Sequence, residues 1–393
     1  MILKEHTDHE KYYVPKVVSI GPYHHGKPEF ESVEGFKRLY TNKLLKGNQE
    51  LIRSLYDNLA TMVHTLRGNY DDDVDHLSDD EFTRMMLLDG CFVLFIIKHI
   101  FSNEGFDILG LKSHQIMFVQ QDMFLLENQI PYQVLTEVMH LVSESELNVT
   151  WDSKIKQFID DNILAEARCT IGTHVRSPKV PVNDPILACT NHLLELLQTR
   201  LTKEKCGGPR LPNDRHTFRN VSELKEVGIH FKPSQTRSLA YIKFSKCGIF
   251  ANLELPPITV DDSTKPMLLN LVAYEMCSND INASWVTSYI CLLDSLIDHS
   301  EDVKVLRKAG ILDNRLGSDK EVALLFNEIG KDLVPNSMAY SDARYGIQKH
   351  YDSKRNTLIT QLKREYIKSP WAFVALLAGL VGKLLLLAHR DTT

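Results

Sequence analysis

Hydrophobic residues recur every three or four positions over most of this chain, which is the spacing of a buried helix face. The pattern predicts helices between residues 31 and 67. From Phe82 to about Phe101 the residues are apolar nearly all round, which predicts a helix at the centre of the core. Ser78 and Glu81 have the spacing of a capping box, so this helix should begin there. Further helices are predicted over residues 113–126, 131–143, 151–167, 185–203, 265–277, 284–298, 301–309, 319–330 and from about 339.

The period changes over residues 228–255, where short segments alternate between apolar and polar residues and turn residues separate them. These segments predict a small antiparallel sheet, inserted at about residues 225–262. The fold class expected is therefore mainly α (α+β). It comprises an extended amino-terminal segment over residues 1–30 and a helical globular domain over residues 31–368 that contains the β insertion.

The longest apolar run lies at the carboxyl end, where residues 370–389 form a candidate transmembrane helix. From Trp371 to Ala388 a helix would be about 27 Å long, close to the roughly 30 Å of hydrocarbon in a bilayer. Trp371 suits the membrane interface as an anchor, and basic residues precede it. Lys383 opposes insertion by about 2.5–3.5 kcal/mol, although its long side chain can reach the far interface. The alternative is a buried core helix from Trp371 to Gly382.

Charge and cysteine content narrow the class of protein. The 393 residues carry a formal net charge of −6 and no basic stripe, which argues against a nucleic-acid partner. The amino terminus lacks the apolar core of a signal peptide. Seven scattered cysteines without a Cys-x-x-Cys pair favour reduced thiols in the cytosol over disulfides or a zinc site. The sequons at Asn148, Asn220 and Asn282 are therefore expected to stay unmodified.

Five polar residues are candidates for chemistry. His24 and His25 could act as a metal or acid/base pair, but adjacent residues in an extended turn point in different directions, which favours structural hydrogen bonds. Asp89 lies in the apolar central helix, and Glu127 and Asn128 precede Pro131. These could form a buried acid/base site with raised carboxylate pKa values. The structural alternative is that Glu127 and Asn128 cap the helix that begins at Pro131.

The standard motifs for metal, phosphate and nucleophile sites do not appear in the sequence. Asp71, Asp73 and Asp75 resemble the start of a calcium loop, but His76 stands in place of its glycine and Phe82 in place of its last glutamate. His-Glu-x-x-His, Gly-x-Ser-x-Gly and the phosphate-binding loop are absent. We therefore predict no cofactor, no metal and no small-molecule ligand, while noting that groups assembled only by folding leave no short motif.

Five stretches together resemble the plant family of domain of unknown function 247, in the family's order. They are Val18-Ser19-Ile20-Gly21-Pro22-Tyr23-His24-His25-Gly26, Met85-Met86-Leu87-Leu88-Asp89-Gly90-Cys91-Phe92, Leu125-Leu126-Glu127-Asn128-Gln129-Ile130-Pro131, Asn270-Leu271-Val272-Ala273-Tyr274-Glu275 and Ser369-Pro370-Trp371-Ala372. The resemblance implies a mostly helical plant protein with a carboxy-terminal membrane segment and no established catalytic activity. Some grass members are associated with self-incompatibility, which implies recognition or signalling. The short tail and Lys383 depart from the family pattern.

Taken together, these features predict a membrane-anchored protein whose bulk faces the cytosol, with the plasma membrane favoured. Its expected partners are the membrane and a protein, and its expected role is interaction, recognition or signalling. Two alternatives remain open. One is an enzyme with a site near His24, His25, Asp89 and Glu127, and the other is a soluble scaffold whose tail docks into its own core.

Overall fold

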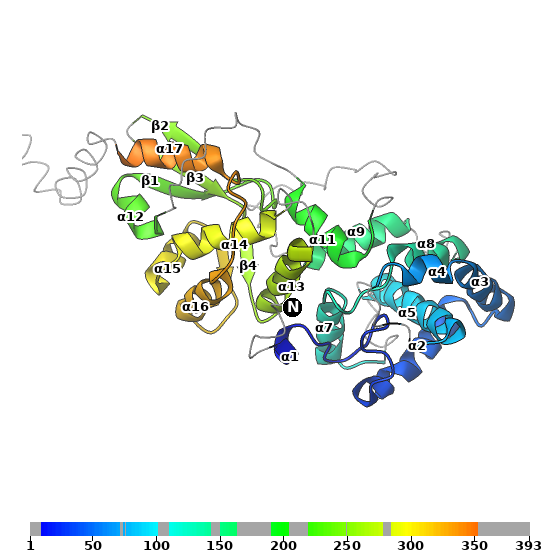
Figure 1. Cartoon of the computed structure of the whole chain (residues 1–393). Helices are drawn as coiled ribbons and strands as arrows, with labels where there is room; N and C mark the ends of the chain where they lie inside the picture. Colours follow the sequence, from blue (N-terminus) through cyan, green and yellow to red (C-terminus); the bar gives the residue numbers. More distant parts are fainter. Residues whose placement is uncertain are drawn as a thin grey trace, which may run out of the picture. The chain divides into compact units, whose positions relative to one another are not determined.

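The computed structural model describes residues 9–70, 74, 76–100, 110–142, 150–162, 190–203, 219–248, 250–277 and 284–352. These residues are mainly helical, with two small sheets (Figure 1). The chain divides into two compact units, each assembled from two stretches of sequence. Unit 1 comprises residues 1–203 and 259–286, and unit 2 comprises residues 204–258 and 287–393. The predicted domain boundaries at residues 30 and 368 stay predictions.

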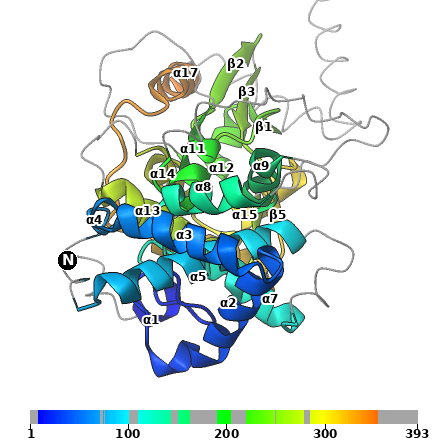
Figure 2. The same cartoon turned by 90° about the vertical axis from the view of Figure 1, so that its right-hand side faces the viewer.

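Unit 1 is built around one long helix, α5 (Asp79–His99), against which α2, α3, α8 and α9 pack (Figures 1 and 2). From Phe82 to Ile97 all of its residues except Arg84 and Leu88 are buried, as the apolar sequence predicts. The elements of this unit are α1 (His9–Tyr12), η2 (Pro28–Phe30), α2 (Glu31–Leu44), α3 (Gln49–Thr61), α4 (Val63–Arg67), α5, α7 (Ser113–Asp122), α8 (Tyr132–Leu141), α9 (Trp151–Asn162), α11 (Leu193–Thr202) and α13 (Thr264–Cys277).

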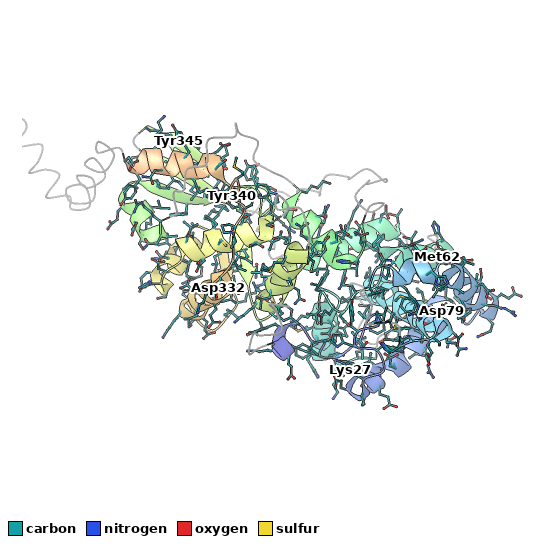
Figure 3. The ribbon with its side chains drawn as sticks, viewed as in Figure 1. Lys27, Met62, Asp79, Asp332, Tyr340 and Tyr345 are labelled. Atoms are coloured by element: carbon teal, nitrogen blue, oxygen red, sulfur yellow. The ribbon has the colours of Figure 1, made fainter. Side chains whose placement is uncertain are left out.

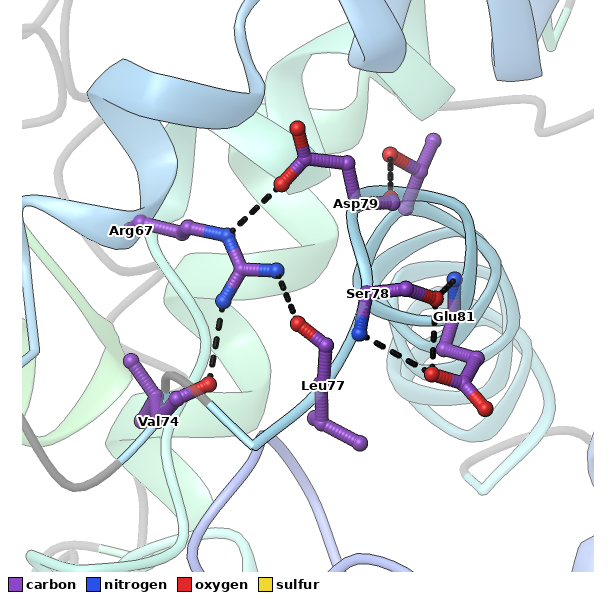
Figure 4. A network of polar contacts seen from close by, with 7 residues as sticks. Arg67, Val74, Leu77, Ser78, Asp79 and Glu81 are labelled. Carbon is purple, nitrogen blue, oxygen red and sulfur yellow. Dashed lines mark hydrogen bonds and ion pairs between the residues drawn. The ribbon is translucent and has the colours of Figure 1, made fainter.

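The start of α5 is fixed by side chains. The predicted capping box is present: Glu81 N–H donates to Ser78 Oγ at 3.3 Å, and Ser78 N–H donates to the Glu81 carboxylate at 2.9 Å (Figure 4). Arg67 holds the preceding turn, because its guanidinium donates to the Val74 carbonyl at 3.0 Å and to Asp79 at 3.1 Å. The helix therefore begins three residues earlier than its apolar run.

Close packing around α5 depends on an aromatic stack and on a glycine. The Tyr40 ring of α2 stacks on Phe95 at 4.5 Å and on Phe92 at 5.5 Å between ring centroids. On another side of α5, Gly90 faces Val134 of α8, where a Cβ would lie 2.8 Å from the Val134 side chain. The absent side chain lets these two helices approach each other closely.

Unit 2 contains a three-stranded sheet in the order β1 (Ile229–Pro233), β3 (Phe250–Leu255), β2 (Lys243–Cys247). The prediction of an antiparallel sheet is wrong for one pair. β2 and β3 are antiparallel, as neighbouring strands joined by a short turn must be, but β1 and β3 are parallel. The alternation of apolar and polar residues along a strand predicts which face of the sheet is buried. It does not indicate whether two paired strands run parallel or antiparallel.

A second sheet joins β4 (Ile258–Val260), which lies within the predicted β insertion, and β5 (Leu312–Asn314), which the sequence did not predict. It includes a hydrogen bond from Ile258 N–H to the Ile311 carbonyl at 2.7 Å. Each of these strands has only three residues, too few for an alternation of apolar and polar residues to be recognised in the sequence. The remaining helices are α12 (Val221–Glu226), α14 (Trp285–Leu296), α15 (Ser300–Lys308), α16 (Asp319–Gly330) and α17 (Ser341–Tyr351).

Two contacts hold the helices of unit 2 to one another and to the sheet. Asp302 accepts the Ser222 N–H at 3.0 Å and the Asp298 N–H at 3.2 Å, so one carboxylate serves the starts of both α12 and α15. α17 packs against β2, where the Phe244 ring lies so close to Gly346 that a Cβ there would clash with it. Among the described residues no helix is both long and apolar enough to cross a membrane. The candidate anchor with Trp371 and Lys383 lies outside them.

Candidate functional site

The residues with the most notable chemistry in unit 1 surround a short extended segment, residues 16–21, which we call the N-terminal strap. Its sequence, Lys-Val-Val-Ser-Ile-Gly, has no neighbouring strand with which to share hydrogen bonds in the described structure. Buried backbone N–H and C=O groups without partners cost about 1–3 kcal/mol each. Side chains from four different elements or loops supply those partners, as the following contacts show.

Asp122, at the end of α7, takes the first three N–H groups of the strap. One carboxylate oxygen accepts Lys16 N–H at 2.9 Å, and the other accepts Val17 N–H at 2.8 Å and Val18 N–H at 3.0 Å. Burial raises the pKa of Asp122 to about 6. The three N–H groups and the charge of Lys16 favour the carboxylate and make this rise in pKa smaller. The carboxylate therefore binds consecutive backbone donors, as an anion does at a helix start.

Asn128, in the loop between α7 and α8, forms hydrogen bonds with the next backbone groups of the strap. Its side-chain oxygen accepts Ile20 N–H at 2.7 Å, and its nitrogen donates to the Val18 carbonyl at 3.1 Å. The same nitrogen donates to the Asp122 carbonyl at 2.9 Å. An amide that accepts from one residue and donates to the residue two positions earlier imitates a neighbouring β-strand. Asn128 is completely buried, so these hydrogen bonds are made inside the protein, to the strap and to the end of α7.

Lys37 of α2 and Asp89 of α5 complete the contacts at the end of the strap. Asp89 accepts Gly21 N–H at 2.8 Å, and Lys37 donates to the Ser19 carbonyl at 2.6 Å. The Lys37 ammonium lies 2.6 Å from an oxygen of Asp89 and 2.6 Å from an oxygen of Glu34. Both Lys37 and Asp89 are fully buried, which makes this a buried salt bridge with its remaining hydrogen bonds on backbone.

The pKa values around Lys37 follow from burial and from its two carboxylates. Burial disfavours the charged ammonium, but Asp89 and Glu34 outweigh it and raise the Lys37 pKa above its ordinary value. Burial also raises the pKa of Asp89, and Lys37 and the Gly21 N–H work against that rise. Lys37 is therefore a structural cation, held by three oxygen atoms.

The strap ends at a glycine for a steric reason. Gly21 has a φ of 80°, and a Cβ there would clash with the carbonyl oxygen of Gln129. Only glycine adopts this conformation readily and leaves that space empty. Gln129 in turn donates to the carbonyls of Met123 and Leu125, both at 2.8 Å, and accepts Leu194 N–H at the start of α11 at 3.2 Å. The side chain of Gln129 therefore connects the loop between α7 and α8 internally and to the start of α11.

Asn270 of α13 also binds backbone groups with its side-chain amide, at the residues that precede the strap. It donates to the Tyr12 carbonyl at 2.9 Å, just before the strap, and to the Pro266 carbonyl at 2.8 Å. Its oxygen accepts Leu126 N–H at 2.8 Å. A side chain far along the sequence thus joins the amino-terminal segment to the loop that holds Asn128.

A family model described as a plant protein of unknown function, DUF247, matches residues 2–386. The chain belongs to this family. It is 27% identical to the UPF0481 protein At3g47200 of Arabidopsis thaliana over 398 aligned residues, covering 93% of this chain and 79% of that protein. It is 24% identical to a second protein of that plant, At3g02645, over 460 residues, covering 95% of this chain and 85% of that one. No solved structure matches the chain.

Four of the five stretches that resemble the DUF247 family meet at or beside the strap. Residues 18–26 include most of the strap itself, and residues 85–92, 125–131 and 270–275 carry Asp89, Asn128 and Asn270. These four stretches, which are far apart in the sequence, are therefore connected by hydrogen bonds at the strap of unit 1. The fifth stretch, residues 369–372, lies outside the described residues.

The five candidate residues do not assemble as an acid/base site. Asp89 and Asn128 come together at Gly21 and Ile20, where both bind backbone. The interpretation of Asn128 as a cap of the following helix is wrong, because α8 starts after Pro131 without a side-chain cap and the Asn128 amide is used on the strap. Glu127 is half-buried and takes no part in these contacts.

The two histidines have separate surroundings. His24 is buried, with its Nδ1 2.9 Å from Lys27 Nζ and its ring edge-on to Phe30. His25 is half-buried in the turn that follows the strap, and its N–H donates to the Pro22 carbonyl at 3.2 Å. Among the described residues no three His, Cys, Asp or Glu side chains are placed to hold a metal ion.

Sequence reasoning missed Asp122, Lys37 and Asn270. Lys37 has a recognisable signal, since it lies on the helix face that also carries Val33, Tyr40 and Leu44, and a charge on a buried face needs a partner. Asn270 falls inside a stretch that resembles the family, but its role could not be read there. Asp122 has no local signal, because its three donors lie more than a hundred residues away.

Proposed function

We propose that this protein works by binding a protein partner while its carboxyl-terminal tail holds it in a membrane. One observation carries the first half of the proposal. Asp89 and Asn128, the polar groups best suited to catalysis, are fully buried and bind the backbone of the strap. Groups whose hydrogen bonds are used in this way hold a fold together, and they offer no reactive atom to a substrate.

The apolar run from Trp371 to Ala388 supports the membrane half of the proposal. The family model describes no activity that would argue for catalysis. A recognition role, of which self-incompatibility is one example, agrees with polar groups such as Asp89 and Asn128 being used to hold the fold together. In this account the bulk of the chain faces the cytosol at the plasma membrane.

Membrane fractionation tests the anchor. The full chain is compared with a chain that ends at Lys368, and the membranes are washed with alkaline carbonate to remove peripheral protein. We expect the full chain to stay in the washed membranes and the shorter chain to be released. If both chains are released and the shorter one is also less stable, the tail belongs to the core and the membrane proposal is wrong.

Glycan analysis in plant cells tests the orientation. Asn220 is the informative sequon, because its amide donates to Asp298 at 2.8 Å and its oxygen caps α12 through Glu223 N–H at 2.8 Å. A sugar on this nitrogen would replace one of its hydrogens and crowd both contacts. We expect Asn148, Asn220 and Asn282 to carry no glycan; a glycan on any of them would contradict a cytosolic orientation.

A further inference from the structure

Strand β2 lies at an edge of the three-stranded sheet in unit 2, because the strand order is β1-β3-β2. It pairs with β3 continuously from Lys243, opposite Glu254, to Cys247, opposite Phe250. Within the described ranges no residue forms a hydrogen bond or an ion pair with the outer edge of β2. An edge strand in this state presents backbone N–H and C=O groups with which a further strand can pair.

The turn after β2 shows which of its backbone groups point outward. Two residues join Cys247 to Phe250, so these two form the hydrogen-bonded pair of a tight hairpin, and the φ of 62° at Gly248 suits its turn. Hydrogen-bonded pairs alternate with non-hydrogen-bonded pairs along an antiparallel ladder. The N–H and C=O groups of Phe244 and Lys246 therefore point away from β3, toward the open edge.

Helix α17 packs against β2 on one face of the sheet (Figure 1). Gly346 of α17 lies against the Phe244 ring, and the His350 ring is edge-on to Phe244 with 6.1 Å between the ring centroids. Side chains alternate between the two faces of a strand, so Lys246 lies with Phe244 on the face toward α17, and Lys243 lies on the opposite face. A strand added to the open edge therefore meets Phe244 and Lys246 on the α17 side.

The helix α17 is fixed near both of its ends. The hydroxyl of Tyr340, which Figure 3 labels, donates to the Leu239 carbonyl shortly before β2 at 2.7 Å. Near the other end, His350 Nε2 donates to the Val227 carbonyl at 2.9 Å. Because the edge strand and the helix beside it are held in place already, a partner that binds there costs little conformational entropy on this side.

The side chains of β2 indicate the charge of that partner. Lys243 and Lys246 are exposed, and neither forms an ion pair with another described residue. Glu254 is the cross-strand neighbour of Lys243, so Lys246 contributes more to the positive charge of this edge. Pairing with β2 of a second copy would bring both pairs of lysines together, which is unfavourable. A strand with acidic side chains is favoured instead.

We propose that β2 binds an extended acidic segment of a partner protein as a fourth, antiparallel strand of the sheet. The partner residues opposite Phe244 and Lys246 exchange backbone hydrogen bonds with β2, an apolar side chain contacts the half-buried Phe244, and carboxylates lie opposite Lys243 and Lys246. Since an antiparallel partner runs in the reverse direction, its sequence reads acidic, any residue, apolar, acidic. The inference rests on the protein partner proposed above and adds where it binds.

Peptide binding to the full chain in neutral detergent tests the charge of this site. The probe is the labelled peptide Thr-Thr-Glu-Thr-Val-Glu-Thr-Thr, whose affinity is measured by fluorescence anisotropy. We expect the wild type to bind it and Lys243→Glu/Lys246→Glu to bind it about ten-fold more weakly. Lys225→Glu/Lys320→Glu, which makes the same change in charge at exposed positions on α12 and α16, should bind within about two-fold of the wild type.

Methylation of single peptide nitrogens distinguishes strand addition from attraction of charge alone. In the expected register the N–H group of the valine points at β2, and that of the threonine before it points away. A methyl group on the valine nitrogen should weaken binding by about ten-fold, because it removes a hydrogen bond and obstructs the pairing. The same group on that threonine nitrogen is the matched control and should change the affinity by less than about two-fold.

The other outcomes overturn the proposal in different ways. If the two methylated peptides bind alike, no strand is added. If both charge-reversal variants bind as well as the wild type, the acidic peptide binds elsewhere, so a protein partner stands and this site is wrong. If the wild type binds no peptide and sediments as a dimer that Lys246→Pro dissociates, β2 pairs with a second copy.

A wild type that binds no peptide and sediments as a monomer would also overturn the proposal, because the lysines would then only protect a free edge from pairing. None of these results depends on the membrane anchor, which the carbonate wash tests separately.

Discussion

The side-chain amide of Asn128 accepts the N–H of Ile20 at 2.7 Å, across 108 residues of sequence. Together with Asp122, Lys37 and Asp89, it turns an isolated extended segment into a fixed part of unit 1. The strap resembles a bound peptide whose backbone is recognised by side chains, and its sequence-specific requirement is the glycine at position 21. The stability of unit 1 should therefore depend on these few polar groups.

Replacing Asn128 by alanine should lower the free energy of unfolding by about 3 kcal/mol, because Ile20 N–H and two carbonyls lose their partner inside the protein. Urea unfolding of the full chain in detergent measures this. Asn58→Ala is the matched control, since Asn58 is exposed on α3, and it should change stability by no more than about 0.5 kcal/mol. Equal effects of the two substitutions would show that Asn128 does not hold the strap.

Lys37→Met should destabilise unit 1 by about 3–5 kcal/mol, because it leaves the buried Asp89 carboxylate without its cation. Adding Asp89→Leu should recover part of the loss, because the isolated charge is then gone. Arg84→Met breaks an exposed pair with Asp80 and serves as the control, for which we expect little change in the unfolding midpoint. A double variant less stable than the sum of the two single variants would contradict the salt bridge.

Asp122 should make the protein less stable as pH rises from about 4 to about 6. Its pKa is about 6 in the folded protein and 3.8 ordinarily, so between these values the folded state binds more protons than the unfolded state. The stability of the wild type relative to Asp122→Asn should therefore fall by up to about 3 kcal/mol across this range. Urea unfolding at several pH values measures the difference, and a difference that rises with pH would refute the assignment.

His192 should make the protein more stable as pH rises from about 4 to about 6.5, the opposite of the effect of Asp122. Its Nδ1 accepts Glu195 N–H at 3.2 Å at the start of α11, which requires a lone pair, and burial lowers the His192 pKa to about 4 from 6.5. Between these values the unfolded state binds more protons, so stability is lost as pH falls from about 6.5 to about 4. His192→Asn keeps a cap without a titrating group, so the wild type should gain stability over it as pH rises, by at most about 3 kcal/mol.

The sequence predicted what is encoded locally. Continuous apolar residues predicted α5, and Ser78 and Glu81 predicted its start, because a capping box needs only four consecutive residues. The parallel pairing of β1 with β3 and the strand β5 were missed, since pairing depends on distant segments. Asp89 and Asn128 were noticed as unusual polar residues, but their role became visible only with the strap in place. The same holds for Asp122, whose partners lie more than a hundred residues away.

Amide hydrogen exchange of the strap in the full chain tests the central claim most directly. The account predicts slow exchange for the N–H groups of Lys16, Val17, Val18, Ile20 and Gly21, each of which donates to a buried side chain. Asn128→Ala should remove protection first at Ile20, while Asn58→Ala should leave the whole strap protected. Exchange of the wild-type strap as fast as in an unstructured peptide would contradict the account, because Asp89 and Asn128 would then be available for another role.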